Sequence, residues 1–548
     1  MQSLTIVLAQ MTQVLGAPVA NADAMLAVRA AHADADLILF PELQLPGYPA
    51  EDLVQKPAFG EACEAELARM AAEGAQGGPA MLVGTLVRRD GKVYNGMALL
   101  DGGTVEITLK QSLPNYGTFD EARVFAHGPP ARPFDFRGVR IGVPICEDIW
   151  APHVCDDLAR QRADLMLVPN GSPFEHDKRA RRMAEVRLRV AETGLPMAFL
   201  NRVGGQDEIV FDGASFAVNP GGEVAVRLPD WDEADVVTHW TRTSDGWRCE
   251  AGERAQDDEP FADLYHAMLV GLRDYVNRNG FRGVILGLSG GIDSHLTAAV
   301  AVDALGPDRV RCVMLPSRYT SQASLDDAAA GAKLLGVRLD TVSIAPGVDA
   351  LDAMLEPAFA GTVPGLAEEN IQSRLRMVAL MALSNRFGDM LLTTSNKSEI
   401  ACGYSTLYGD MSGGYGVLAD MYKSQVFDVA RWRNGTKPRL GLGPDGPVMP
   451  DAVITKPPSA ELRPDQKDSD SLPPYDVLDA ILQGLVEDER SVSDIAAQGF
   501  DRDTVARVER MLAASEYKRF QAPPAVKLGH RNFGRDRRYP LTNAFRTS

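Results

Sequence analysis

Short apolar runs that end in polar residues recur along the first 240 or so residues. Apolar runs of about four to eight residues predict buried strands, whereas apolar residues three or four apart predict helices. Ala-rich stretches with helical spacing, such as ANADAMLAVRAAHA and DKRARRMAEVRLRVAETG, separate several of the runs. The alternation predicts an α/β layered domain. The predicted strands are LTIVLAQ (4–10), DLILFPE (36–42), MLVGTLV (81–87), VEITLKQ (105–111), VRIGVPICED (139–148), DLMLVPN (164–170) and PMAFLNR (196–202).

A second α/β pattern fills the rest of the chain. It starts with the helix FADLYHAMLVGLRDYVNRNG, which is followed by the strand GVILGLS, a Gly-Gly turn and a new helix from about Asp293. The strands RVRCVMLP (309–316) and DMLLTTS (389–395) follow, and the helix NIQSRLRMVALMALSNRFG (370–388) lies between them. Repeated strand-helix units of this kind predict a doubly wound parallel sheet.

The two patterns are separated by TRTSDGWRCEAGERAQDDEP (241–260), which is polar, acidic and without clear periodicity. We therefore expect domains at 1–245 and 261–548, joined by a linker at 246–260. The length of 548 residues agrees with two domains, because single hydrophobic cores stop growing near 250 to 300 residues. The segment 435–474 is rich in Pro, Asp and Lys, which predicts a mobile loop.

Charge and composition exclude several classes of function. Lys plus Arg is 56 and Asp plus Glu is 74, and the net charge of −18 disfavours nonspecific binding to nucleic acid or anionic lipid. The sequence has no apolar run of about 20 residues, and its start lacks the features of a signal peptide, so we expect a cytoplasmic protein. The six cysteines are scattered without C-x-x-C pairs, which indicates reduced thiols and no zinc site.

Three residues with complementary chemistry each follow a predicted strand. They are Glu42 after DLILFP, Lys110 after VEITL and Cys146 after VRIGVPI. A cysteine is nucleophilic as its thiolate, so it needs a base or a cation nearby. Glu42 could take the thiol proton, and Lys110 could stabilise both a thiolate and an oxyanion. Each residue alone also fits an ordinary buried thiol or a strand-end charge.

The surrounding segments FPELQLPGYP, LKQSLPNYGTFDEARVF and PICEDIW together resemble the nitrilase family of carbon-nitrogen hydrolases. The resemblance implies an αββα sandwich in which Glu42, Lys110 and Cys146 form the catalytic triad. The glutaminase members of this family bind glutamine through residues that match Tyr116, Ser172 and Lys178 of this sequence. Glu121 matches a supporting second glutamate of the family, although a surface carboxylate is an equally good interpretation.

GLSGGIDS (287–294) joins an apolar strand to a helix, where small residues let backbone N–H groups approach an anion. The lysine of the common phosphate loop is missing. The S-G-G-x-D-S pattern resembles the pyrophosphatase loop of ATP-dependent adenylating enzymes. It implies ATP binding by residues Gly287, Leu288, Ser289, Gly290, Gly291, Ile292, Asp293 and Ser294, with Asp293 holding Mg2+.

Further segments narrow the substrate, namely EENIQSRLRM, LLTTSNKSEIACGYSTLYGDMSGGYG, LADMYKSQVF, PPSAELRPDQKDSDSLPPYDVLD and YKRFQAPPAVK. In this order they resemble the NAD+ synthetase family, in its shorter bacterial two-domain form. The resemblance implies that Thr394 contacts ATP and that Lys423 approaches phosphate. It also implies that Asn370, Glu399 and Lys518 bind deamido-NAD+ and that Glu399 is a second Mg2+ ligand.

The implied reaction joins both domains. Ammonia released from L-glutamine amidates deamido-NAD+ through an adenylate, giving NAD+, AMP, pyrophosphate and glutamate as the final step of NAD+ biosynthesis. The resemblance also implies a homo-oligomer. A GMP or asparagine synthetase shares the ATP loop but carries a different glutaminase, and the asparagine type needs a cysteine where Gln2 stands. A noncatalytic protein that kept both folds would have lost a triad or loop residue.

Overall fold

The computed structural model describes residues 2–464 and 466–546 and divides this chain into two compact units. The first holds the chain up to Gln206 and Val210–Asp258. The second holds Asp207–Ile209 and the chain from Glu259 onward. Position 465 of the predicted loop and positions 547–548 of the predicted second domain lie outside the described residues.

The first unit has two β-sheets among its described residues, with the strand orders β15-β14-β1-β2-β3-β4-β5 and β13-β12-β9-β8-β7-β6, besides the hairpin β10-β11. The larger sheet comprises β1 (Ser3–Gln10), β2 (Leu37–Leu39), β3 (Ala80–Arg89), β4 (Lys92–Asp101), β5 (Thr104–Leu109), β14 (Ala234–Thr243) and β15 (Gly246–Cys249). The other sheet comprises β6 (Phe134–Phe136), β7 (Val139–Gly142), β8 (Leu165–Pro169), β9 (Met197–Leu200), β12 (Phe216–Val218) and β13 (Val224–Arg227). The hairpin consists of β10 (Val203–Gln206) and β11 (Ile209–Asp212).

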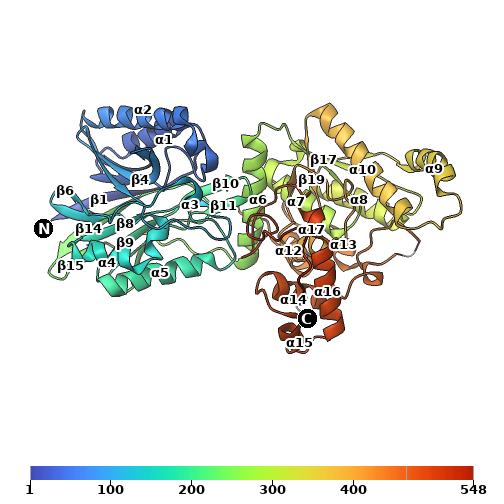
Figure 1. The fold of residues 1–548 in the computed structure, drawn as a ribbon. Coiled ribbons are helices and arrows are strands. Elements are labelled where there is room, and N and C mark those ends of the chain that lie inside the picture. Colours follow the sequence, from blue (N-terminus) through green and yellow to red (C-terminus); the bar gives the residue numbers. More distant parts are fainter. Residues whose placement is uncertain (1, 465, 547–548) are drawn as a thin grey trace. The chain divides into compact units, whose positions relative to one another are not determined.

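Helices cover both outer faces of the paired sheets (Figure 1). Helices α1 (Pro18–Ala31) and α2 (Pro57–Gly74) lie on one side, and α4 (Pro152–Arg160) and α5 (Lys178–Thr193) lie on the other. Proline stands at the first position of α1, α2 and α4, where its fixed φ favours the helix and its missing N–H costs nothing. Buried strand residues such as Ile6, Leu39 and Leu167 fill the space between the sheets. The predicted αββα sandwich is therefore confirmed.

The boundary of the first unit differs from the predicted linker. Residues 246–249 form β15, which pairs antiparallel with β14, so they belong to the larger sheet. Trp247 and Cys249 are buried in the core between the sheets, while the residues that alternate with them are half-buried. Because polar residues flank these two positions, the sequence pattern did not indicate this short strand. The first unit extends to Asp258.

The second unit contains a parallel sheet with the order β18-β17-β16-β19-β20. Its strands are β16 (Val284–Gly287), β17 (Val310–Met314), β18 (Arg338–Thr341), β19 (Met390–Thr393) and β20 (Tyr415–Gly416). Numbered within the unit, this order is 3-2-1-4-5, which confirms the predicted doubly wound topology. The strand order reverses between β16 and β19, because β17 and β18 extend the sheet to one side of β16 whereas β19 and β20 extend it to the other. Ligands of such sheets bind at the carboxyl ends of the two strands at this point.

Helices surround this sheet, and a smaller helical group follows it. The first set is α6 (Pro260–Arg278), α7 (Ile292–Leu305), α8 (Gln322–Leu335), α9 (Ala345–Phe359), α10 (Leu366–Phe387), α11 (Lys397–Cys402) and α12 (Lys423–Gly435). The second set is α14 (Tyr475–Val486), α15 (Val492–Ala496), α16 (Arg502–Ala514) and α17 (Glu516–Arg519). Helices α14 and α16 pack on α11, and α15 packs on α14 and α16, around a core that includes Leu482 and Val505. Among the described residues, no helix is both long and apolar enough to span a bilayer.

The segment 435–474, predicted as a mobile loop, is mostly irregular but well anchored in its described part. It contains the short helix α13 (Asp451–Thr455), and Val448 and Met449 are buried. The Asn434 side chain accepts hydrogen bonds from the backbone N–H groups of Val448 and Met449, both at 3.0 Å. Side chains of α12 thus hold the first part of this segment, which its composition does not reveal.

Candidate active sites

A buried lysine joins two glutamates in the first unit. Lys110 Nζ lies 2.7 Å from Glu42 Oε1 and 2.7 Å from Glu121 Oε2. Glu42 follows β2, Lys110 follows β5, and Glu121 begins the short helix α3 (Glu121–Val124). The side chains of Glu42 and Lys110 are 0% exposed, so the ion pair is fully removed from water. The fold therefore brings together two of the predicted triad residues and the predicted second glutamate.

Cys146 begins the 3-10 turn η2 (Cys146–Ile149) just after β7. Its φ of 48° lies in the left-handed region, which a residue with a Cβ rarely adopts. Asp148 holds this turn, because its carboxylate accepts hydrogen bonds from the backbone N–H groups of Ile145 at 3.0 Å and Ser112 at 2.7 Å. Strained backbone of this kind recurs at functional sites. Asp148 thus ties the turn of Cys146 to the segment after Lys110.

The site favours a protonated thiol and a charged lysine. Burial raises the pKa of the Cys146 thiol, and the negative charge of Glu42 adds to this effect, while Lys110 opposes it. Burial alone would lower the pKa of Lys110, but Glu121 and Glu42 offset it, so that the pKa lies well above its ordinary value. Burial raises the pKa of Glu121 to about 7. A thiol that is protonated at rest can act as a nucleophile only if a neighbouring base takes its proton during the attack.

Glu42 is oriented by neutral donors as well as by Lys110. Asn95 Nδ2 donates to Glu42 Oε1 at 2.7 Å, and the backbone N–H of Gly171 donates to Glu42 Oε2 at 2.9 Å. On the other side, the Tyr48 hydroxyl donates to Glu121 Oε1 at 3.0 Å. Sequence reasoning missed these supporting residues, because hydrogen bonds between positions so far apart in the chain leave no local pattern.

The three predicted glutamine-binding residues differ in exposure. The Tyr116 side chain is exposed, and its hydroxyl donates to the carboxylate of Glu147 at 3.0 Å. Ser172 and Lys178 are both 7% exposed. Burial lowers the pKa of Lys178, whose Nζ lies 3.7 Å from Glu175 Oε2. A hydroxyl and a desolvated ammonium of this kind suit a ligand carboxylate.

The second unit contains a cavity of about 360 Å³ at the reversal point of its sheet. Seven of the eight predicted loop residues line it, and Thr394 and Glu399, which follow β19, line it as well. The eighth, Gly290, has a φ of 83°, and a Cβ there would lie 2.4 Å from the Ser324 backbone oxygen. Glycine is therefore required at the turn that brings the loop against α8. The lining loop residues are Gly287, Leu288, Ser289, Gly291, Ile292, Asp293 and Ser294.

Hydroxyl groups brace this loop at the start of α7. The Ser294 hydroxyl donates to the Gly291 carbonyl at 2.9 Å and accepts from the Ser289 backbone N–H at 3.2 Å. The Ser289 hydroxyl in turn accepts from the Gly291 N–H at 3.3 Å. The loop is thus fixed at a helix N-terminus, where the helix dipole and free N–H groups favour phosphate.

Two carboxylates share one lysine beside the loop. Lys423 Nζ lies 2.5 Å from Asp293 Oδ2 and 3.5 Å from Glu399 Oε1. Burial raises the pKa of Glu399 to about 8, and the charge of Asp293 adds to this rise while Lys423 opposes it. When both carboxylates are ionised, one lysine cannot compensate their charge, and hard oxygen ligands of this kind suit Mg2+. Lys423 was expected near phosphate, and its Nζ reaches the residues that line the cavity.

Asn370 and Lys518 lie beside the segment that follows α11. Asn370 Oδ1 accepts a hydrogen bond from the Thr406 hydroxyl at 2.8 Å. Lys518 Nζ donates to the carbonyls of Gly403 at 2.7 Å and Ser405 at 2.6 Å. Both side chains thus hold residues 403–406, and Lys518 lines a separate small cavity. The structure brings Glu399 to the loop, whereas these two residues act on a neighbouring segment.

Several polar residues that sequence reasoning did not single out line the main cavity. Arg376 comes from the motif RLRM on α10, and its Nε donates to the Leu315 carbonyl at 3.1 Å. Glu461 accepts from the hydroxyls of Ser321 at 2.8 Å and Ser324 at 2.9 Å. The motifs that contain these residues were recognised, but spacing alone does not show which members face the cavity. The other charged residues of this kind are Asp410, Lys456 and Asp468.

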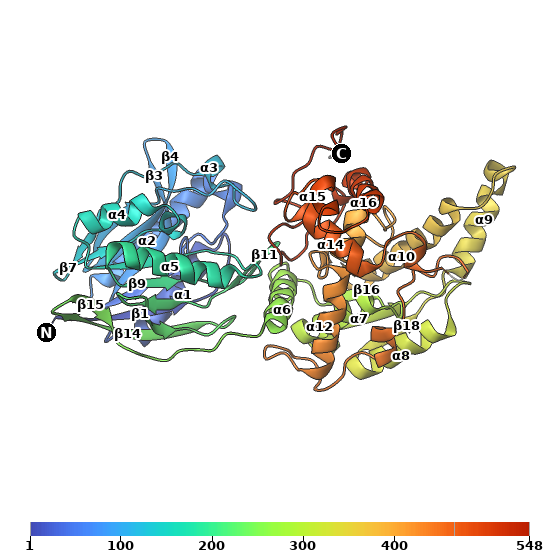
Figure 2. The same ribbon diagram turned by 90° about the horizontal axis from the view of Figure 1, so that it is seen from below.

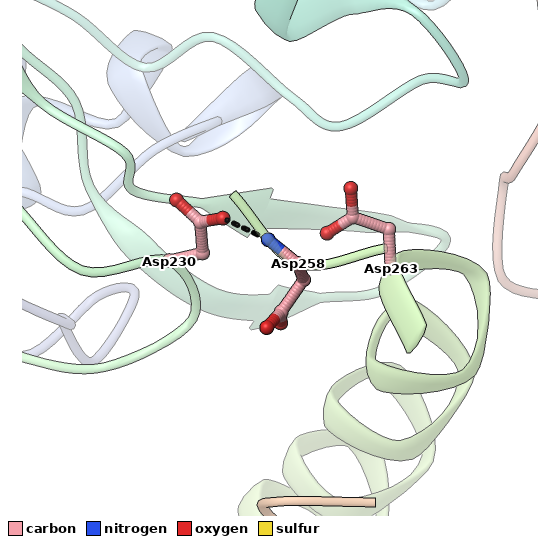
Figure 3. A group of neighbouring side chains, drawn as sticks. All are labelled: Asp230, Asp258 and Asp263. Atoms are coloured by element: carbon pink, nitrogen blue, oxygen red, sulfur yellow. Dashed lines mark hydrogen bonds between the residues drawn. The ribbon is translucent and has the colours of Figure 1, made fainter. Parts of the chain in front are cut away.

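An acidic group lies where the first unit ends. The Asp258 backbone N–H donates to Asp230 Oδ2 at 3.2 Å, and Figure 3 shows this bond. Asp230 is already paired with Arg179 and Arg227, both at 2.9 Å. The third residue drawn, Asp263, belongs to α6 of the second unit. Because the charge of Asp230 is neutralised by arginine, we assign no ion to these residues.

Comparisons with known proteins match both halves of the chain. A model of the carbon-nitrogen hydrolase family matches residues 5–242, and a model of the NAD synthase family matches residues 264–522. The glutamine-dependent NAD(+) synthetase of Rhodobacter capsulatus is 51% identical over 543 residues, which cover 99% of this chain and 98% of that protein.

Solved structures agree with this assignment. The glutamine-dependent NAD+ synthetase of Acinetobacter baumannii, solved in complex with ADP, is 40% identical, covers 100% of both chains and superposes with a TM-score of 0.78. The enzyme of Cytophaga hutchinsonii is 20% identical with a TM-score of 0.81 over 99% of this chain and 98% of that one, which shows the shared fold. With both catalytic domains present in the same order along one chain, this protein belongs to the family of glutamine-dependent NAD+ synthetases.

Proposed function

We propose that the residues gathered at the two sites divide one synthesis between them. The chain is a glutamine-hydrolysing NAD+ synthetase, which amidates deamido-NAD+ with ammonia from glutamine and forms AMP, pyrophosphate and glutamate through an adenylate. Adenylation is needed because a carboxylate is a poor electrophile, whereas its mixed anhydride with AMP has a good leaving group. The first unit carries the glutaminase residues, and the second carries the ATP loop.

In the glutaminase we assign Cys146 as nucleophile, Glu42 as general base and Lys110 as the cation that stabilises the oxyanion. The protonated resting thiol gives its proton to Glu42 as its sulfur attacks the glutamine amide. Glu42 then protonates the leaving nitrogen, and ammonia departs to leave a thioester. Water hydrolyses the thioester to glutamate. Glu121 keeps Lys110 charged and in place throughout.

Glutamine itself is held by Tyr116, Ser172 and Lys178. Support comes from the burial of Ser172 and Lys178, whose hydroxyl and ammonium groups match the α-carboxylate of the substrate. Tyr116 is more exposed and donates to Glu147, the neighbour of the nucleophile. These side chains select an amino-acid amide over a simple amide.

In the synthetase site, the loop from Gly287 to Ser294 receives the ATP phosphates, and Thr394 contacts the nucleotide from the end of β19. The support is the braced loop at the N-terminus of α7, which lines one side of the cavity, with Thr394 on the same cavity. Lys423 supplies a positive charge beside this loop. The shape of the site depends on Gly290, which no larger residue could replace without moving α8.

We assign Mg2+ to Asp293 and Glu399. The residues fit this ion, because two carboxylates face one lysine and the pKa of Glu399 is raised in part by the charge of Asp293. When bound, Mg2+ would neutralise the charge of the departing pyrophosphate. Lys423 would then be released from part of its pairing with Asp293, and its ammonium could turn to a phosphate oxygen.

Asn370, Glu399 and Lys518 contribute to the deamido-NAD+ site. We propose that Asn370 and Lys518 do so by fixing residues 403–406, because their side chains are engaged there by hydrogen bonds. The same stretch leads to Asp410, which lines the cavity and accepts a hydrogen bond from the Thr406 N–H at 2.6 Å. Glu399 faces the cavity directly.

We further propose that the enzyme is a cytoplasmic homo-oligomer. Helix α9 and the start of α10 stand out from the rest of the second unit in both views (Figures 1 and 2). Met354 is 72% exposed and Leu366 is 75% exposed, and apolar side chains exposed to this degree favour burial against another chain. Sedimentation of the purified protein tests the assembly.

One observation supports this function most directly. The same chain holds the buried Glu42–Lys110–Glu121 cluster beside Cys146 and the braced ATP loop. The test supplies ATP, Mg2+ and glutamine with deamido-NAD+, xanthylate or aspartate, and measures AMP and the amide product. Formation of NAD+ from deamido-NAD+, with no amide product from xanthylate or aspartate, supports the assignment. Amidation of xanthylate or aspartate without formation of NAD+ would instead identify a GMP or asparagine synthetase.

A further inference from the structure

We infer that Arg182 is a positioning residue that sets the Ser172 hydroxyl for recognition of the glutamine carboxylate. Arg182 lies on α5 and is 1% exposed. Its Nε donates to Ser172 Oγ at 2.9 Å, and its Nη2 donates to the carbonyls of Ser172 at 2.8 Å and Pro173 at 2.7 Å. A single guanidinium thus grips both the side chain and the backbone at Ser172.

The direction of these bonds decides what Ser172 can do. A serine hydroxyl has one proton and two acceptor lone pairs. Since Arg182 has no acceptor, its Nε must occupy a lone pair of Ser172 Oγ, and the hydroxyl proton points elsewhere. Among the described residues, the Ser172 hydroxyl donates no hydrogen bond. The Ser172 hydroxyl is therefore oriented to donate a hydrogen bond to a ligand, and the adjacent guanidinium charge strengthens such a bond to an anion.

A buried carboxylate locks the arginine in this orientation. Arg182 Nη1 lies 2.6 Å from Asp212 Oδ1, and the Asp212 side chain is 1% exposed. The planar guanidinium can satisfy Asp212, Ser172 and the two carbonyls together because its donors point in fixed directions. A lysine at the same position would supply the charge, but its donors radiate from one atom and could not reproduce all four bonds.

The backbone at Ser172 has a second, independent support. The Ser172 N–H donates to Asn201 Oδ1 at 3.0 Å, and Asn201 Nδ2 donates to the Ser172 carbonyl at 3.0 Å. The neighbouring N–H of Gly171 donates to the catalytic Glu42. Loss of Arg182 should thus leave the backbone on Asn201 and the triad in place, while the hydroxyl of Ser172 loses its orientation. The expected defect is in glutamine binding and not in bond cleavage.

This inference rests on the proposed function, in which Ser172 binds glutamine. The test compares Arg182→Met, Arg182→Lys and Ser172→Ala in the full-length enzyme, using NAD+ formation from glutamine and from ammonia. Arg182→Met should raise the KM for glutamine about tenfold, as expected for loss of a charge-assisted hydrogen bond. Its kcat with glutamine and its ammonia-dependent rate should stay within about twofold of the unaltered enzyme. The KM for glutamine of Arg182→Lys should lie between that of Arg182→Met and that of the unaltered enzyme.

Arg189→Met is the matched control. Arg189 lies on the same helix, is 3% exposed and is paired with Glu185 at 3.1 Å and Glu192 at 2.7 Å. It should leave the KM for glutamine unchanged, although it also removes a buried arginine from an ion pair. If Arg182→Met does not fold, Arg182→Met combined with Asp212→Asn takes its place, because that pair leaves no unpaired charge on Asp212.

The double variant Arg182→Met with Ser172→Ala separates the possible failures. If Arg182 acts through Ser172, the double variant should have the same KM for glutamine as Ser172→Ala alone. An unchanged KM in Ser172→Ala would refute the proposed glutamine-binding role. A raised KM in Ser172→Ala with a normal KM in Arg182→Met, or equal losses in the Arg182 and Arg189 variants, would overturn the positioning role alone.

Discussion

Replacing Cys146 by alanine should separate the two nitrogen sources of this enzyme. The variant should lose NAD+ formation from glutamine, because no thioester can form. It should keep NAD+ formation from ammonia, because the ATP loop and its cavity belong to the second unit, whose core is separate from that of the first. The nitrogen source is therefore the variable that identifies the role of Cys146.

The expected loss far exceeds any packing effect. Cys146 is 6% exposed, and its change to alanine removes one sulfur atom, which should cost about 1 kcal/mol of stability. Loss of the nucleophile of an acyl transfer lowers kcat by about six orders of magnitude, which corresponds to about 8 kcal/mol in the activation free energy. A packing change of this size could not produce such a loss in one activity while sparing the other.

The assay measures NAD+ formation at saturating ATP and deamido-NAD+, with either glutamine or ammonium chloride as the nitrogen source. Cys155→Ala is the control, because Cys155 is a buried thiol on α4 of the same unit. It should keep both activities. Full glutamine activity in Cys146→Ala would refute the assignment of the nucleophile. Loss of both activities would show that Cys146 supports the fold or that the two units fail together.

Four further changes test the two sites. Lys110→Met should abolish glutamine use and lower the free energy of unfolding, measured in urea, by about 3 to 5 kcal/mol, because it leaves two buried carboxylates without their cation. Asp293→Asn should abolish NAD+ formation from either nitrogen source while glutamate release persists. Gly290→Ala should impair ATP-dependent AMP formation, since a Cβ there meets the Ser324 carbonyl at 2.4 Å and the φ of 83° costs about 1 to 3 kcal/mol. The pKa of Glu121 is raised to about 7, so the folded protein binds this proton more tightly, and the contribution of Glu121 to the free energy of unfolding should fall as the pH rises from 4.5 to about 7. Glu121→Gln should remove that part of the pH dependence.

Each of these expectations has a contrary result. Normal glutamine use by Lys110→Met would break the triad assignment, and near-normal NAD+ formation by Asp293→Asn would remove this residue from the Mg2+ site. Unchanged AMP formation by Gly290→Ala would mean that α8 can move away from the loop. Identical pH dependence of stability in Glu121→Gln and the unaltered protein would contradict the raised pKa of Glu121.

The ends of strands were the most predictable part of this molecule. Glu42, Lys110 and Cys146 each follow an apolar run, and a strand end at the rim of a sheet is where such residues converge. The loop before α7 was predictable for the same reason. These signals are local, because a few consecutive apolar residues and the polar residue after them are enough to produce them.

Elements that depend on distant partners were not predictable in this way. Strand β15 has two buried residues, and it is a strand because it pairs with β14 across a short turn. Strand β4 contains Asn95 and Gly96 within its span, which weakens the apolar pattern, yet it pairs with both β3 and β5. Strand propensity depends on such neighbours, and a single sequence does not reveal them.

The same limit applies to Lys518. A resemblance places it at the substrate, but the structure directs its Nζ to the carbonyls of Gly403 and Ser405, more than a hundred positions away in sequence. Burial lowers the pKa of Lys518, and its two carbonyl acceptors replace the water that it loses. A motif identifies a residue that belongs to a site without stating whether it touches the ligand or shapes the loop that does.

The two sites share one arrangement of charged side chains. In each site one buried lysine lies between two carboxylates, Lys110 between Glu42 and Glu121, and Lys423 between Asp293 and Glu399. Both groups therefore keep excess negative charge when all their members are ionised. Burial raises the pKa of the Cys146 thiol and the charge of Glu42 adds to this rise, so that the thiol keeps its proton until Glu42, the base that we propose, accepts it. Beside the loop of the second unit, burial and the charge of Asp293 raise the pKa of Glu399 to about 8, and the divalent cation that we propose there would offset the charge of both carboxylates. The arrangement of charges is alike, and we propose that the neighbouring group, a thiol in one site and a phosphate-binding loop in the other, decides whether it serves proton transfer or metal binding.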